Sequence, residues 1–128
     1  MEPKTHPGID RGLVGTPEVP GPGLGRVVLV TTPTMRADDQ GLVHGGFVFG
    51  AADLAAMVAV DDPFVVLGAA SVRFLAPVRV GSTVVAEARV SAAAGKKHTV
   101  EVEAKVGDEV VFTGTFTAFV LERHVLSP

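Results

Sequence analysis

The amino-acid sequence predicts an α+β fold in which a long central helix is wrapped by an antiparallel sheet of five or six strands. A β-branched run precedes the apolar stretch Phe47 to Val60, and four strand-like segments separated by glycine and proline follow it. The 128 residues are enough for one domain. We expect this domain at residues 26–128, after an irregular, Pro/Gly-rich segment at residues 1–25.

Local residue patterns predict where each element begins and ends. Before the first core strand, only a short extended piece around Leu13-Val14 is expected. The β-branched run Val27 to Thr32 predicts that strand, and Met35 to Val43 has the composition of a loop. The turn that contains Gly45 then begins the apolar helix, which Asp61-Asp62-Pro63 ends.

The predicted helix is apolar nearly all round its axis, and its small residues let neighbouring backbone come close. We therefore expect it to lie inside the wrapped sheet rather than on its surface. Asp53 is the one charged side chain between Phe47 and Val60. A carboxylate in such a setting loses hydration unless a partner compensates, so Asp53 is the first candidate for chemistry on a bound ligand.

Four strand-like segments follow the helix. They are Phe64 to Ala76, Ser82 to Ala92, Lys97 to Val106 and Glu109 to Glu122. The third alternates between aliphatic and charged residues, which predicts one buried and one solvent-facing side. In the fourth, Phe112 and Phe116 share a face opposite three threonines, so the hairpin at Gly107-Asp108 should bury them against the helix.

The composition argues against several classes of function. The formal net charge is -3 and the 11 Lys and Arg residues are scattered, so nucleic acid is a poor partner. There is no cysteine, and His44 and Asp53 lack metal-ligand spacing, so we expect no metal. No membrane-length apolar run or signal peptide is present, which predicts a cytoplasmic protein without membrane contact. The hydrophobic share of 47% predicts apolar surface buried against another copy.

Three stretches form a recognisable pattern. They are Gly41 to Gly46 (GLVHGG), Phe49 with Ala52-Asp53, and Ser71 to Pro77 running into Gly81. In these residues the chain resembles the hotdog-fold acyl-CoA thioesterases of the phenylacetate-pathway (PaaI-like) type, over residues 26 to 122. The resemblance implies hydrolysis of an acyl-CoA thioester to a carboxylic acid and free coenzyme A. Coenzyme A is then part of the substrate, and no separate cofactor is expected.

The resemblance also implies roles for individual residues. Asp53 would act as nucleophile or general base toward the thioester carbonyl, and the Gly45 N–H would bind the thioester oxygen. His44 would position the loop or the substrate, with Gly46 in the same turn, and Ser71 would orient the attacking water or the carboxylate. The role of Gly45 agrees with elementary chemistry, because free N–H groups at a helix N-terminus suit a developing oxyanion.

Position 38 departs from the family, which usually has Asn or Gln there. An ionised Asp38 cannot donate a hydrogen bond, and a second negative charge near Asp53 would raise the pKa of one of the two. Three interpretations stay open: Gln40 fills the place, Asp38 is a solvated loop residue, or the rate is low. Basic residues could bind the phosphates of coenzyme A, with ordinary solvated surface charge as the alternative. These residues are Arg73, Arg79, Lys96 and Lys97.

Spacing along the helix makes a further prediction. Gly45 and Asp53 are eight residues apart, about 12 Å along a helix. One thioester carbon cannot touch both within one chain, so the site would be completed between two chains, as the family's dimer with its continuous sheet also implies. We therefore expect a homodimer, and a tetramer built from two dimers is compatible with it.

Other functions fit the same residues. A hotdog domain that binds acyl-CoA as a sensor or carrier would show tight binding without hydrolysis, although residues 1–25 are too proline-rich for a helix-turn-helix. A structural module with a degenerate site would bind no acyl-CoA. Individually, Asp53 could cap a loop or pair with an arginine, and Ser71 could be ordinary strand packing.

Overall fold

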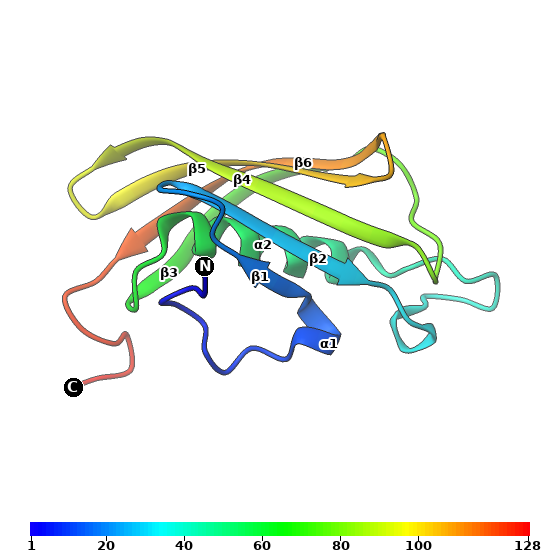
Figure 1. Cartoon of the computed structure of the whole chain (residues 1–128), viewed down its shortest axis with the longest axis horizontal. Coiled ribbons are helices and arrows are strands. Elements are labelled where there is room, and N and C mark those ends of the chain that lie inside the picture. The colour runs from blue at the N-terminus through cyan, green and yellow to red at the C-terminus, as the bar shows by residue number, and fades with distance from the viewer.

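A six-stranded antiparallel sheet curves around the long helix α2 (Figure 1). The computed structural model describes all 128 residues. The elements are α1 (Arg11–Val14), β1 (Thr16–Glu18), β2 (Leu24–Val30), the 3-10 turn η1 (Pro33–Met35), α2 (Gly45–Val60), β3 (Val65–Phe74), β4 (Thr83–Ala94), β5 (Lys97–Val106) and β6 (Glu109–Val120). The predicted architecture of a long helix wrapped by an antiparallel sheet is confirmed, and the sixth strand comes from the N-terminal segment.

The strands are ordered β1-β2-β4-β5-β6-β3, so β1 and β3 form the two edges of the sheet. The expected extended piece at Leu13-Val14 is wrong, because these residues form the end of α1. The Asp10 carboxylate caps α1 by accepting the N–H groups of Gly12 and Leu13, and Gly15, with φ 113, ends it. The extended piece follows instead at Thr16–Glu18 and pairs with β2.

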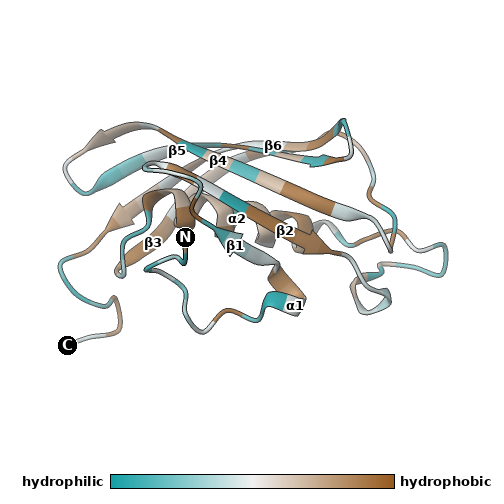
Figure 2. Cartoon of the chain, viewed as in Figure 1, coloured by the Kyte–Doolittle hydropathy of each residue, from teal (hydrophilic) through white to brown (hydrophobic).

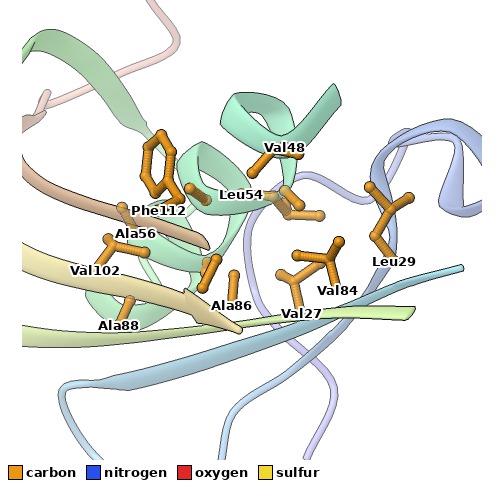
Figure 3. Close-up of a cluster of buried hydrophobic side chains, with 14 of the residues drawn as sticks. Val27, Leu29, Val48, Leu54, Ala56, Val84, Ala86, Ala88, Val102 and Phe112 are labelled. Atoms are coloured by element: carbon orange, nitrogen blue, oxygen red, sulfur yellow. The ribbon is translucent and has the colours of Figure 1, made fainter. Parts of the chain in front are cut away.

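The hydrophobic core lies between α2 and the inner face of the sheet. Strand residues alternate between hydrophobic and hydrophilic along the sheet (Figure 2), as the sequence of β5 predicts. Phe112 and Phe116 are fully buried, and the ring of Phe116 lies 5.6 Å from that of Phe49 on α2, so the expected packing of the last hairpin is confirmed. Figure 3 shows side chains of α2, including Leu54, meeting those of the sheet.

The helix and the sheet come unusually close at Gly25 of β2. A Cβ there would collide with the Ala55 carbonyl oxygen and would lie 2.7 Å from the Ala59 nitrogen. The alanines of α2 therefore face a strand that has no side chain at the contact. This is the close backbone approach that the small residues of the helix predict.

One stripe of α2 and the outer edge of strand β3 are not covered by the rest of the chain. The helix residues of this stripe are the exposed Gly46 and the partly exposed Phe49, Gly50 and Asp53, whose spacing places them on one face. Strand β3 has no neighbour on its outer side, and its residues 68–71 are exposed. The chain thus leaves an open face along α2 and β3, and Asp53 lies on it.

Candidate active site

The N-terminus of α2 carries two backbone N–H groups without an acceptor. His44 is the N-cap and makes no side-chain cap, and neither Gly45 nor Gly46 donates its N–H to any group in the chain. The turn itself is fixed, because the His44 N–H donates to the Met35 carbonyl at 2.9 Å. Free N–H groups at the positive end of a sixteen-residue helix form a site for a negatively charged oxygen.

Aromatic side chains lie close to both glycines of this turn. A Cβ on Gly45 would lie 3.1 Å from the ring of Phe74, and a Cβ on Gly46 would lie 3.1 Å from the ring of His44. The exposed His44 ring stands edge-on to Phe47, with ring centroids 6.2 Å apart, and makes no hydrogen bond. His44 therefore shapes the surface beside the free N–H groups without being held by a partner of its own.

Asp53 is a partly buried carboxylate without a partner. Its Oδ1 atom is fully buried and receives no hydrogen bond, although the residue as a whole keeps some exposure. In this chain Asp53 therefore neither caps a loop nor pairs with an arginine. Burial raises its pKa from 3.8 to about 6, because low-dielectric surroundings disfavour the charged form. A carboxylate with such a pKa is ionised at neutral pH and accepts a proton more readily than an exposed one.

An apolar groove of about 340 Å³ begins at the helix N-terminus. Gly45 and Val48 form one wall, and the segment Phe74 to Val78, with neighbouring aliphatic residues, forms the other. Asp53 does not line this groove. It lies eight residues further along α2, about 12 Å at the helical rise, so one chain does not bring the Gly45 N–H and the Asp53 carboxylate to one point.

The structure does not place Ser71 beside Asp53, and the predicted role of Ser71 is therefore corrected. Ser71 lies opposite Thr115, whose hydroxyl points to the outer face of the sheet and donates to Glu101 at 2.7 Å. Residues directly opposite each other in a sheet share a face, so the Ser71 side chain also points outward. The sheet then separates it from α2 and Asp53.

A β-bulge explains why sequence reasoning misplaced Ser71. Leu67 lies opposite the buried Ala118, and a regular strand would continue inward at every second residue, through Ser71. The pairing shifts between Leu67 and Ala69, so one extra residue, Gly68, reverses the alternation. A Cβ on Gly68 would collide with the Phe119 ring, which favours glycine at the bulge.

Arg73 lies on the same outer face as Ser71. It pairs opposite Thr113, and both line a hollow of about 730 Å³ together with Glu87, Glu101 and other polar residues. Three carboxylates, of Glu87, Glu101 and Glu103, outnumber the two guanidinium groups of Arg73 and Arg89 in this hollow, and this balance disfavours phosphate groups. Because the sheet lies between this hollow and α2, the structure does not bring Arg73 to the candidate site.

Asp38 and Gln40 belong to the exposed loop before the glycine turn. The Asp38 Oδ1 atom accepts the N–H groups of Gln40 at 2.9 Å and of Leu42 at 3.3 Å. Of the three interpretations of position 38, the structure supports a solvated loop residue, with its carboxylate holding the turn. Gln40 is exposed in the same loop and makes no side-chain hydrogen bond that would direct it toward Asp53.

The lysines proposed for phosphate binding lie at the wrong end of the sheet. Lys97 pairs opposite Phe119, while Phe74, which contacts Gly45, pairs opposite Phe112 at the other end of β6. Lys96 sits in the β4–β5 turn, 3.8 Å from a Glu122 carboxylate oxygen. Within one chain, neither lysine is near the groove. Arg79 lies closer to it, in a bridge to Leu42.

Two further classes of site can be checked in the structure. No three His, Asp or Glu side chains cluster in a way that would hold a metal ion. No helix combines the length and the apolar composition needed to cross a membrane.

Comparisons with known proteins agree with the fold of this chain. The solved structure of the uncharacterised protein PH1136 from Pyrococcus horikoshii is 50% identical, covers 99% of this chain and 98% of its own, and superposes with a TM-score of 0.96. An asparagine-to-aspartate variant of the phenylacetic acid degradation protein PaaI from Thermus thermophilus is 26% identical, with a TM-score of 0.77 over 85% of this chain and 95% of that one.

Two curated relatives are longer than this chain. Methylthioribose-1-phosphate isomerase of Aquifex aeolicus is 49% identical over 123 residues, which are 95% of this chain and 27% of the relative. Transcription factor FapR of Caldanaerobacter subterraneus is 34% identical over 66% of this chain and 42% of its own length. The chain thus spans about a quarter to two fifths of these relatives. The family model of the thioesterase superfamily matches residues 40–113. The chain therefore belongs to the thioesterase superfamily and has its hotdog fold.

Proposed function

We propose that this protein hydrolyses an acyl-CoA thioester to a carboxylic acid and free coenzyme A. The observation that carries the proposal is the unpartnered, half-buried carboxylate of Asp53 on the open face of α2. Membership in the thioesterase superfamily and the likeness to PaaI support the same reaction class. The free N–H groups at Gly45 and Gly46 can bind the oxyanion that forms on the thioester oxygen.

Asp53 acts on the thioester carbonyl carbon. As a general base it removes a proton from a water molecule while the water oxygen bonds to that carbon, and the carbonyl oxygen becomes an oxyanion. The carbon–sulfur bond then breaks, and the leaving thiolate of coenzyme A takes up a proton. Direct attack by the carboxylate, which forms an acyl-enzyme anhydride that water hydrolyses, remains the other route.

Gly45 binds the oxyanion through its backbone N–H. The donor costs no reorganisation at the moment of reaction, because the turn that holds it is already fixed. Glycine also lets the substrate approach between the helix and the Phe74 ring. The apolar groove of about 340 Å³ beside Gly45 offers a place for an apolar part of the substrate.

A second copy of the chain completes this site. An antiparallel pairing of two β3 edges around the exposed residues Ala69 and Ala70 would extend the sheet and cover the unpaired edge. It would also place the open stripes of the two α2 helices side by side in opposite directions. Gly45 of one copy could then lie across from Asp53 of the other, which removes the separation of about 12 Å along the helix.

The test of Asp53 is thiol release from a panel of acyl-CoA thioesters. We expect Asp53→Asn to lower kcat by roughly 10² to 10⁴, the usual contribution of a general base, while Asp39→Asn, an exposed loop carboxylate, serves as the matched control. Equal rates for wild type and Asp53→Asn would contradict the proposal.

The test of the oxyanion donor compares two substitutions of Gly45. Proline is well tolerated at the first residue of a helix, and His44 already has the extended backbone that a following proline requires. Gly45→Pro removes the N–H, whereas Gly45→Ala keeps it and adds similar bulk toward Phe74. We expect the proline variant to have a kcat roughly 10² to 10³ below that of the alanine variant. Equal kcat values would remove Gly45 from the mechanism.

A binding protein without turnover is the second candidate. Asp53 lacks the supporting group that the resemblance implies for it, because the Ser71 side chain points away from α2. The similarity to a protein named as a transcription factor points in the same direction. Tight binding of a non-hydrolysable acyl-CoA thioether, with no hydrolysis of any acyl-CoA tested, would favour this function.

A further inference from the structure

A third cavity, of about 450 Å³, lies at the end of α2 opposite to Gly45. Its walls are the strap, defined as residues Lys4 to Pro7, the start of β3 with the residues before it, Pro63 to Val66, and the pair His124-Val125. The strap is tied to the fold, because the Lys4 N–H donates to the Asp61 carboxylate at 2.6 Å. The cavity is thus built by an ordered part of the chain that the proposed reaction does not use.

His6 is the most unusual residue of this cavity. Its backbone has φ 55, a left-handed conformation that non-glycine residues rarely adopt. Its Nδ1 atom lies 2.7 Å from the hydroxyl of the buried Thr5, and its Nε2 atom has no partner in the chain. Burial lowers the pKa of His6, so the ring is neutral at pH 7. A neutral imidazole can donate or accept one further hydrogen bond, according to its tautomer.

The remaining walls combine apolar surface with one free cation. Phe64 and Val125 are exposed at the cavity, and Lys4 has no carboxylate within 4.0 Å of its ammonium group. The nearby carboxylates of Asp61 and Asp62 each accept a backbone N–H. Apolar side chains, the neutral His6 ring and a free ammonium group match a heteroaromatic base that is joined to phosphate.

The distance from Asp53 also fits such a ligand. The strap is bound at Asp61, the C-cap of α2, which lies eight residues beyond Asp53, about 12 Å at the helical rise. The pantetheine arm of coenzyme A is about as long as four extended residues, or roughly 14 Å. A thioester held at Asp53 can therefore reach the cavity with its nucleotide end.

We propose that this cavity binds the adenine nucleotide end of coenzyme A, with His6 against the base and Lys4 against a phosphate. The inference rests on the proposed hydrolysis of acyl-CoA and adds a source of selectivity to it. Thioesters whose carrier has no nucleotide would lack this contact. The protein would then prefer coenzyme A thioesters to the same acyl group on pantetheine alone.

The test is a comparison of two substrates, an acyl-CoA and the matching acyl-pantetheine. The variant is Lys4→Gln with His6→Asn, because asparagine tolerates the left-handed backbone. We expect it to lower kcat/KM for the acyl-CoA about tenfold through KM and to leave acyl-pantetheine unchanged, since one or two hydrogen bonds and a surface charge are lost. His98→Asn, a histidine outside the cavity, should change neither substrate.

The outcomes separate this inference from the proposed function. Equal losses on both substrates would give the strap a merely structural role and would overturn the inference. Asp53→Asn should slow the hydrolysis of both substrates alike. If it slows neither, only the proposed hydrolysis mechanism is contradicted. Adenosine 3′,5′-bisphosphate gives a readout without catalysis: we expect it to bind wild type about tenfold more tightly than the Lys4/His6 variant. Absence of binding at millimolar concentration, or equal affinity for both proteins, would overturn the inference whatever the rates.

Discussion

Replacing Asp53 with asparagine should stabilise the protein at pH 8 and leave its stability nearly unchanged at pH 4. The pKa of Asp53 is raised from 3.8 to about 6, so the folded chain binds a proton more tightly than the unfolded chain in this window. The free energy of unfolding therefore falls as pH rises from about 4 to 6 and stays low above it. Asparagine has nearly the same shape and carries no charge, so it avoids this loss.

The magnitude follows from the shift of about two pH units. At 1.36 kcal/mol per unit, the buried charge costs about 3 kcal/mol at pH 8. This is an upper value, because solvent reaches part of the side chain and screens its charge. In a domain of ordinary stability such a gain is large, and it would accompany a loss of activity, as expected where a destabilising buried charge serves function.

Urea denaturation of wild type and Asp53→Asn at pH 4 and pH 8 would measure the effect. Protein concentration must be equal in all four experiments, because dimer formation contributes to apparent stability. The control is Asp39→Asn, whose carboxylate is exposed, and we expect its effect to stay within about 0.5 kcal/mol. A gain that is the same at both pH values, or a loss at pH 8, would refute the reasoning about burial.

Further predictions follow from the same geometry. The kcat/KM for acyl-CoA should rise with pH and level off with an apparent pKa near 6, the value for Asp53, and a flat profile between pH 5 and 7 would contradict its role as base. Ser71→Ala should change kcat/KM less than about twofold, since the side chain lies on the outer face. Ala70→Asp should give a monomer by light scattering together with loss of hydrolysis; a dimer with full activity would exclude pairing through β3. Gly25→Ala should lower the free energy of unfolding, measured by urea denaturation, by about 1–3 kcal/mol, because the added Cβ meets helix backbone.

Much of the fold could be predicted because its strongest signals are local. The alternation in β5 and the long apolar run of α2 correspond to elements that the structure bounds at Lys97–Val106 and Gly45–Val60. The positions of Gly45 and Asp53 on one helix also follow from the sequence alone, since helical rise fixes their separation. Asp53 stands out by composition, and its buried, unpartnered oxygen agrees with that interpretation.

Other parts of the candidate site could not be placed without knowing how the strands pair. Whether Ser71 faces α2 depends on the bulge at Gly68, and single-sequence periodicity gives no count of bulges. The Lys96-Lys97 turn lies at the end of the sheet away from Gly45. This position depends on how the strands are ordered and paired, which the local sequence pattern does not show. The signal for α1 was available in Asp10 and Gly15, a cap and a stop that bracket one turn.

Local patterns predict the long helix, five of the six strands and the pair of Gly45 and Asp53, because these rest on periodicity and on the fixed rise of a helix. Three other features depend on the tertiary structure. The Asp53 oxygen has no partner, Ser71 points away from it, and the strap is bound through the Lys4 N–H to Asp61 at the end of α2. Each of these depends on which segments, distant in the chain, come into contact, and local pattern carries no information about that.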